Sequence, residues 1–246
     1  MRDNLIKDFQ RKLKCIFIHV PKAAGTSIEQ TIFQANKWLS GHIKARDYLK
    51  NNPDEFNNFF SFGFTRNPHD RFVSAFFYLK KGGGTIDDNL WAKKYIEKYN
   101  SFEEFVLALN DERNKYIIIN WIHFLPQYYF LCNKNKKILV NFVGKTENIQ
   151  EDFQKVCLHL NIKRDIKVTN SSKHAHYLSY YNKTTYQIVY KIYKNDFKIF
   201  NYRSEEDLIV NKDFSILFKI KLYIERINSI LKYYICHPKK IFKRFT

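Results

Sequence analysis

An apolar run occupies positions 15–20, near the start of the chain. Its continuity and its β-branched residues are typical of a strand that is buried on both faces of a parallel sheet. The run breaks at Pro21 into a short stretch of small residues with one lysine, and the positions that follow predict a helix from about Thr26 to Phe33. The pattern therefore predicts a strand, a tight loop and a helix in succession.

The same order of elements recurs twice further along the chain. The stretch FFSFGFTRNPHDRFVSAFFYL predicts a strand that ends near Thr65, a turn at Asn67 and Pro68, and a helix through Leu79. The stretch ILVNFVGKTENIQEDFQKVCLHL predicts a third strand followed by its helix. Because strands that alternate with helices form parallel sheets, we expect one α/β domain with a mainly parallel β-sheet flanked by helices.

Two further helices are predicted outside these units. Ser101, with Glu104 three positions later, has the pattern of a capping box, so we expect a helix to begin there. A second helix is predicted from positions that repeat at helical spacing. These positions are Ile188, Val189, Ile192, Tyr193, Asp196, Phe197 and Phe200.

The last part of the chain predicts an amphipathic helix that Pro238 ends. Such a stripe packs on the domain, pairs two copies of the chain into a homo-oligomer, or adsorbs to an anionic membrane. Packing is the plainest of these, and the basic tail KKIFKRFT adds weight to peripheral membrane contact. The apolar positions are Leu217, Ile220, Ile224, Ile227, Leu231 and Tyr234.

Composition narrows the class of protein. The chain has 42 Lys and Arg against 24 Asp and Glu, which leaves a formal net charge of +18 and attracts phosphates, acidic glycans, nucleic acid or membrane surfaces. Its four cysteines lie far apart without metal-ligand spacing, so we expect no metal site, no disulfide scaffold and a reducing cytoplasm. The sequence shows no signal peptide and no membrane-spanning run, which predicts a cytoplasmic protein that is soluble or peripheral at the inner face of a membrane.

The loop after the first predicted strand carries groups that bind anions. The first N–H groups of a helix lack partners and point outward, with the positive end of the helix dipole behind them. Small residues leave the backbone accessible, two hydroxyls add donors and can cap the helix, and a lysine adds a mobile charge. A merely well-capped turn is the plain alternative. The residues concerned are Lys22, Ala23, Ala24, Gly25, Thr26 and Ser27.

The lysine of this loop precedes the glycine, whereas the Walker A pattern places it after the glycine. An ordinary ATPase or kinase loop is therefore disfavoured. The second strand and helix add Arg66 at the end of the strand and Ser74 within the helix. Because ligands collect at the carboxyl ends of parallel strands, the two junctions are expected to face one ligand that carries two anionic groups. For Asp70 and Arg71 we expect an ion pair on an exposed first turn.

These motifs resemble those of the carbohydrate sulfotransferases. HVPKAAGTS is similar to the 5′-phosphosulfate loop of enzymes that use 3′-phosphoadenosine 5′-phosphosulfate (PAPS), and RNPHDRFVSAFFY resembles their 3′-phosphate motif. NFVGKTENIQEDFQKV and YYNKTTYQIVYKIYKNDFKIFNY resemble the second half of the group that includes heparan sulfate 2-O-sulfotransferase-like and bacterial members. The resemblance covers about residues 15–202. On this basis we divide the chain into a basic extension (1–13), a sulfotransferase domain (14–205) and a basic amphipathic helix with its tail (206–246).

The resemblance implies a role for each motif. Residues 22–27 would form a P-loop-like loop around the 5′-phosphosulfate, while Arg66 and Ser74 would hold the 3′-phosphate. Lys22 would neutralise the charge that builds on the leaving phosphate during an in-line displacement, without a metal. Lys173, in a loop that closes over the nucleotide in the family, is a candidate phosphate contact, with an ordinary solvated loop as its alternative. The acceptor would be a hydroxyl of a carbohydrate, as part of a surface polysaccharide or a glycolipid.

The acceptor hydroxyl needs a base, and His42 in LSGHIKARDYLKNN matches a histidine of the related 2-O-sulfotransferases. An unperturbed imidazole pKa of about 6.5 suits proton removal near neutral pH. The alternatives are an ordinary surface histidine at position 42 and a carboxylate base such as Glu29. We expect His19 to be packed behind the loop and Gln127 to line the space for the acceptor.

Two other classes of function are weighed against this one. A kinase-like nucleotide enzyme is opposed by the position of the lysine. A nucleic-acid-binding protein would explain the positive charge and the many Tyr and Phe residues, but it leaves the paired anion loops unexplained, so we expect no nucleic-acid partner.

Overall fold

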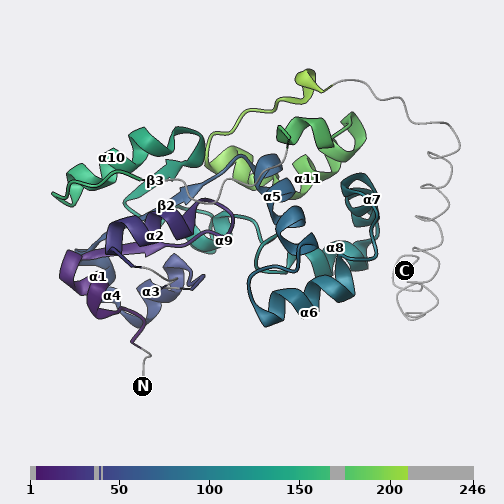
Figure 1. Ribbon diagram of the computed structural model, residues 1–246. Helices are drawn as coiled ribbons and strands as arrows, with labels where there is room; N and C mark the ends of the chain where they lie inside the picture. Colours follow the sequence, from purple (N-terminus) through teal and green to yellow (C-terminus); the bar gives the residue numbers. More distant parts are fainter. Residues whose placement is uncertain (1–3, 36–38, 40, 167–174, 210–246) are drawn as a thin grey trace, which may run out of the picture.

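The computed structural model describes residues 4–35, 39, 41–166 and 175–209, and its centre is a parallel sheet (Figure 1). Strands β1 (Cys15–Ile18), β2 (Phe60–Thr65) and β3 (Phe142–Lys145) lie in the order β1-β2-β3. Both neighbouring pairs are parallel, with Phe17 opposite Phe62 and Phe64 opposite Gly144. The predicted α/β class and the three strand–loop–helix units are confirmed.

Helices surround this sheet and extend beyond it. The helices of the described chain are α1 (Asp8–Leu13), α2 (Gly25–Phe33), α3 (Ala45–Asn51), α4 (Pro53–Asn58), α5 (Pro68–Lys80), α6 (Ile86–Tyr95), α7 (Phe102–Leu107), α8 (Glu112–Ile119), α9 (Tyr128–Leu131), α10 (Ile149–His159) and α11 (Lys183–Ile199). Short 3₁₀ turns lie at η1 (Ala108–Asn110), η2 (Thr146–Asn148), η3 (Tyr177–Tyr180) and η4 (Glu206–Leu208).

The sheet is covered on both faces, which explains the continuous apolar run of the first strand. Cys15 and Phe17 of β1 face a cluster that includes residues of α2 and α10. Ile16 and Ile18 point to the opposite face, toward a cluster that includes residues of α3, α4 and α9. Because successive strand residues alternate between faces, a strand buried on both sides must be apolar at every position.

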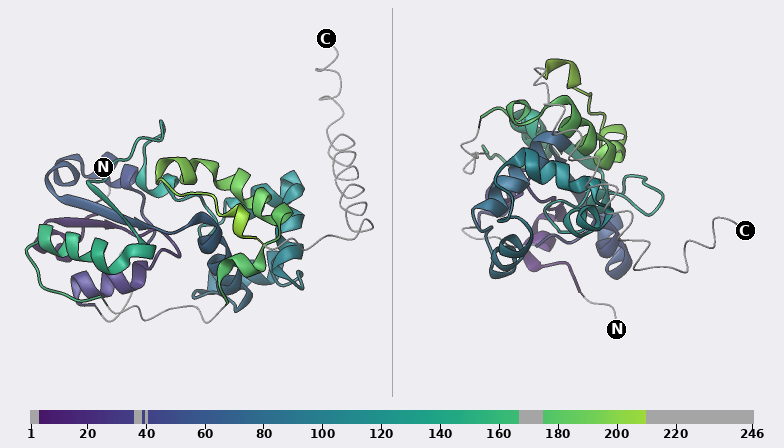
Figure 2. Two further views of the ribbon diagram at one scale, coloured as in Figure 1. Left: turned by 90° about the horizontal axis from the view of Figure 1, so that it is seen from above. Right: turned by 90° about the vertical axis from the view of Figure 1, so that its right-hand side faces the viewer.

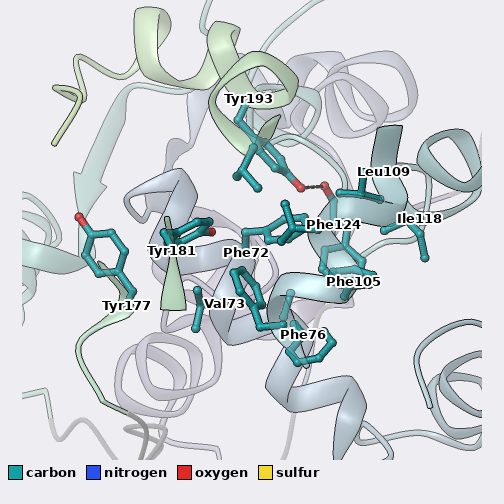
Figure 3. Close-up of a cluster of buried hydrophobic side chains, with 14 of the residues drawn as sticks. Phe72, Val73, Phe76, Phe105, Leu109, Ile118, Phe124, Tyr177, Tyr181 and Tyr193 are labelled. Atoms are coloured by element: carbon teal, nitrogen blue, oxygen red, sulfur yellow. Dashed lines mark hydrogen bonds between the residues drawn. The ribbon is translucent and has the colours of Figure 1, made fainter. Parts of the chain in front are cut away.

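A second, wholly helical part of the core lies beside the sheet. In Figures 1 and 2, helices α6, α7, α8 and α11 gather at one end of the molecule, and α5 runs from the sheet into them. Figure 3 shows its aromatic centre, where Phe72 stacks on Phe105 at 5.5 Å between ring centroids. Tyr193 donates a hydrogen bond to the carbonyl of Phe124 at 2.5 Å, which satisfies the one polar atom of its buried ring. This body fixes α5, the helix that carries the second predicted motif.

The predicted helices at Ser101 and at positions 188–200 are present as α7 and α11. The hydroxyl of Ser101 accepts a hydrogen bond from the Glu104 N–H at 3.1 Å, as an N-cap should. The Glu104 side chain accepts from the N–H of Asn100 rather than of Ser101, so the box closes one residue earlier than predicted. The C-terminal stripe at 217–234 lies outside the described residues.

None of the helices among the described residues is both long enough and apolar enough to cross a membrane. No group of three or more His, Cys, Asp or Glu side chains among these residues is arranged to hold a metal ion.

Candidate active site

The loop between β1 and α2 is held in an unusual backbone conformation. Lys22 and Ala24 both have positive φ, at 64° and 58°, in the left-handed region that disfavours side chains with a Cβ. Ala24 is the N-cap of α2, whose described first turn has no side-chain cap and no acidic residue. Thr26 and Ser27 lie inside that turn, so the expectation that they cap the helix is wrong. An N-cap side chain must come from the residue before the helix, and alanine has no oxygen to offer.

Close packing against the end of β1 supports this loop from behind. A Cβ added to Gly25 would lie 2.1 Å from atoms of the His19 ring, so only glycine lets the two segments approach this closely. His19 is buried, as expected, and its Nδ1 lies 3.7 Å from the carboxylate of Glu29 in α2. The loop is therefore clamped between the strand end and the helix that follows it.

Arg71 holds the loop from the side of α5. Its guanidinium is buried and donates hydrogen bonds to the carbonyls of Pro21 at 2.8 Å, Leu125 at 2.9 Å and His123 at 3.1 Å. The predicted exposed ion pair between Asp70 and Arg71 is wrong. The two side chains leave the first turn of α5 in different directions, and Asp70 pairs with Arg66 instead. Arg71 is thus a structural link between the loop and the helical body.

Lys22 points across the loop to α5. Its ammonium lies 3.7 Å from the centre of the Tyr78 ring, a cation–π contact. Burial and then the nearby charge of Arg66 lower the pKa of Lys22 to about 8, against the opposing effect of Asp88. A half-buried cation with a positive neighbour is stabilised by a bound anion, so the chemistry of this position fits a phosphate or sulfate group.

The end of β2 lies directly beside this loop. The Arg66 guanidinium donates to the Lys22 carbonyl at 3.5 Å through Nη1. Its Nε and Nη2 make a two-pronged contact with Asp70, at 2.7 and 2.8 Å. Ser74 follows eight residues later in α5 and is buried, at 5% exposed. The structure thus brings Arg66 to the 22–27 loop, as the strand-end argument predicted.

Gln127 fixes the position of Arg66. Its side-chain oxygen accepts from the Arg66 N–H, and its side-chain nitrogen donates to the Arg66 carbonyl, both at 2.9 Å. The buried Asp196 carboxylate accepts from the Gln127 N–H at 2.8 Å. The expectation that Gln127 lines the space for the acceptor is wrong, because its side chain is completely buried and its amide is used by the backbone.

His42 lies against the back of the same loop. Its Nδ1 is 3.1 Å from the His19 carbonyl. Since a carbonyl only accepts, Nδ1 carries the proton and Nε2 is the proton-accepting position. Burial, followed by the neighbouring His19, lowers the pKa of His42 to about 3, so the ring is neutral at pH 7. The pKa of about 6.5 expected from the sequence is therefore wrong for this enclosed position. The ring is in the neutral form that a general base requires, but it is less basic than a free imidazole.

A buried pair that the sequence did not indicate lies next to His42. The rings of His42 and His123 meet edge to face, 5.8 Å apart. Nε2 of His123 donates to Asp88 at 2.9 Å, and the Tyr78 hydroxyl donates to the other carboxylate oxygen at 3.0 Å. Near Asp88, the sequence offers Thr85 after the glycines at 82–84 as a cap, which indicates where α6 begins. It does not indicate that Asp88 contacts His123.

Glu29 and Lys173 are the two remaining candidate residues. Glu29, the alternative base, is fully buried and accepts from the Leu39 N–H at 3.1 Å in addition to its contact with His19. A carboxylate enclosed in this way has little freedom to meet an acceptor hydroxyl. Lys173 lies outside the described residues.

Comparison with known proteins shows the family of the chain. The family model of the sulfotransferase family matches residues 8–203, and the chain therefore belongs to that family. Carbohydrate sulfotransferase 10 of Gallus gallus is 23% identical over 243 residues, which covers 80% of this chain and 66% of that protein. An uncharacterised protein of Archaeoglobus fulgidus is 29% identical over 117 residues, 46% of this chain and 77% of that protein. Family membership supports sulfotransfer as the class of activity.

Proposed function

We propose that the protein transfers a sulfuryl group from PAPS to a hydroxyl group of a carbohydrate. The observation that carries this proposal is the contact between the two strand ends, in which Arg66 reaches the backbone of Lys22 at 3.5 Å. Two cations on neighbouring junctions fit a donor with anionic groups at both ends. The relative named as a carbohydrate sulfotransferase supports a carbohydrate acceptor.

Two sets of residues would bind the two anionic groups of the donor. Residues 22–27 act as a P-loop-like phosphosulfate-binding loop, because the N-terminus of α2 lacks a side-chain cap in the described structure and meets the anion with its own N–H groups. Arg66 and Ser74 hold the 3′-phosphate. The guanidinium of Arg66 either exchanges Asp70 for the phosphate or binds it through Nη1 while Asp70 keeps the other two nitrogens.

The chemical step needs two further roles. The donor supplies the sulfuryl group: its bond from sulfur to the phosphate oxygen breaks as the bond from sulfur to the acceptor oxygen forms. Lys22 balances the negative charge that builds on the leaving phosphate. Nε2 of His42 accepts the proton of the acceptor hydroxyl and later releases it to solvent. The products are a sulfate ester and 3′-phosphoadenosine 5′-phosphate (PAP).

Nucleotide binding tests the donor site, and sulfate transfer tests the acceptor. Calorimetry should give clearly tighter binding for PAP than for adenosine 5′-phosphate, by about 1.5 to 3 kcal/mol for the extra charge-assisted contacts. Arg66→Ala should remove that preference, and ATP and single-stranded DNA at moderate salt serve as controls. Radiolabelled PAPS with a panel of glycans then identifies the acceptor. Equal affinity for PAP and adenosine 5′-phosphate would overturn the proposal.

A further inference from the structure

Asp88 is linked through one intervening side chain each to Lys22 and His42, the two groups to which the proposed function gives chemical roles. It is the third residue of α6, is 4% exposed, and its backbone N–H donates to the Thr85 cap at 3.0 Å. The preceding turn fits closely around it, since a Cβ added to Gly83, whose φ is 71°, would lie 2.3 Å from the Asp88 Cβ. The carboxylate is thus fixed in place by its own helix start.

Each oxygen of this carboxylate serves a different neighbour. One accepts from Nε2 of His123 at 2.9 Å, and the other accepts from the Tyr78 hydroxyl at 3.0 Å. Although burial works against ionisation, these hydrogen bonds hold the pKa of Asp88 below its ordinary value, so it is negatively charged at neutral pH. The anion therefore orients one phenol and one imidazole at the same time.

Those two rings contact each other, 4.9 Å apart between their centroids, and each also contacts one of the two groups with a proposed role. The Tyr78 ring carries the Lys22 ammonium at 3.7 Å, while the His123 ring packs edge to face with His42 at 5.8 Å. We propose that Asp88 is a positioning residue that sets Lys22 through Tyr78 and His42 through His123, and so aligns the leaving-group side with the base side. This inference rests on the proposed function, because it takes the roles of Lys22 and His42 from it.

A carboxylate that only stabilised the turn before α6, where it accepts from the Gly84 N–H at 3.4 Å, would leave the proposed chemical step unaffected. Titration of Lys22 tests whether the charge of Asp88 reaches the lysine, and turnover tests whether that link matters for the reaction. The charged or titratable groups around the lysine are Arg66 at the end of β2, Arg71 and Tyr78 of α5, Asp88 of α6, and His123 after α8. Asp88 contributes negative charge to this set. Asp88→Asn removes that charge while both arginines remain, so the pKa of Lys22 must fall.

The experiment measures Lys22 directly and does not depend on activity. Trace acetylation of the full-length protein at a series of pH values, read by peptide mass spectrometry, gives the midpoint for Lys22. We expect about 8 in the wild type. In Asp88→Asn the midpoint should be lower by about 1 unit, the low end of the effect of one nearby charge. Asp152→Asn is the matched control, because Asp152 is also largely buried and accepts from the Lys145 N–H at 2.8 Å, but it lies on α10.

Turnover supplies a second readout. Asp88→Asn should lower kcat about 10²-fold, as small misplacements of catalytic groups do, with PAP affinity close to that of the wild type. Should Asp88→Asn fail to fold, Tyr78→Phe keeps the ring and removes only the hydroxyl, with the buried Tyr48→Phe as control. Tyr78→Phe should also lower kcat while PAP still binds.

The outcomes are distinct. An unchanged Lys22 midpoint in a folded Asp88→Asn protein, or normal kcat in Tyr78→Phe, would overturn the inference. Failure of the wild type to bind PAP would instead overturn the proposed function, whatever the titration of Lys22 shows.

Discussion

The two strand–helix junctions at the carboxyl edge of the sheet start their helices in different ways. α5 begins in the ordinary manner: Asn67 caps it by accepting from the His69 N–H at 3.0 Å, Pro68 occupies the first turn, and Asp70 adds an anion there. The N-cap of α2 is Ala24, whose backbone is in the left-handed conformation, and the described first turn has neither a side-chain cap nor an acidic residue. One helix end is satisfied by its own residues, whereas the described start of the other has no side chain that caps it.

Because of this difference, the two halves of the proposed donor site would bind their anions through different groups. At the first junction the backbone N–H groups and helix dipole of α2 are the natural phosphosulfate ligands, with Lys22 beside them. At the second junction the cap already uses the helix end, so a 3′-phosphate must be met by side chains such as Arg66. Under the proposed function, similar topology would thus give two modes of anion recognition.

The largest effect is expected where the first junction is tied to α5. Arg71→Met leaves three backbone carbonyls without their buried donor and should lower the free energy of unfolding by about 3 to 5 kcal/mol. Urea denaturation measures this change. The exposed Arg113→Met is the control and should stay within about 0.5 kcal/mol of the wild type. A mild effect at Arg71 would mean that the loop keeps its shape without this link.

The second largest effect is expected for His42, the proposed base behind the first junction. His42→Ala should reduce kcat by about 10²- to 10⁴-fold and leave PAP affinity nearly unchanged, because the base acts on the acceptor. Burial moves the expected acid limb of kcat/KM below the ordinary histidine value of about 6.5, toward the lowered pKa of about 3. Activity should therefore persist into mildly acidic solution while the protein stays folded. An acid limb near 6.5 that survives in His42→Ala would assign the base to another residue.

The lysine of the first junction should produce a loss at the opposite end of the pH range. Lys22→Ala should lower kcat by about 10²-fold or more and weaken PAP binding less. Because the ammonium loses its charge as pH rises through about 8, wild-type kcat/KM should decline above that value. In Lys22→Arg the decline should disappear, since the guanidinium stays protonated. Normal turnover in Lys22→Ala would mean that the lysine has no catalytic role and is only a structural residue of the turn.

The smallest effects are expected from substitutions at the N-caps of α5 and α2, which test whether the two helices begin in different ways. Asn67→Ala should lower the free energy of unfolding by about 1 to 2 kcal/mol, because it removes the cap of α5 and the buried hydrogen bond that the Asn67 amide donates to the Tyr177 hydroxyl. Ala24→Gly should change it by no more than about 0.5 kcal/mol, since relief of the left-handed strain offsets the lost methyl contact and the added chain entropy. Thermal or urea unfolding of both variants measures the contrast. Equal losses would contradict the view that only one junction caps itself.

The sequence predicted the parts of this site that depend on local pattern and topology. Apolar runs located the strands, and parallel strand order then placed the 22–27 loop next to Arg66. The contacts between distant segments could not be predicted, because nothing near Asp88 indicates His123 and nothing near Arg66 indicates Gln127. Arg71 was misjudged for the same reason: its three partners come from other segments, and burial decides its role.

The register of the sheet also has a consequence for the order in which the chain folds. Cys15 pairs with Phe60, and Phe62 pairs with Phe142, so each strand pair must close a long intervening segment. Helices α5 to α8 are consecutive in sequence and pack with shorter closures, which are less costly in entropy. Pulse-labelled hydrogen exchange during refolding should therefore protect amides of α5–α8 before those of β1–β3. The helical body would then act as the template on which the sheet closes, and simultaneous protection of both would argue for one concerted step.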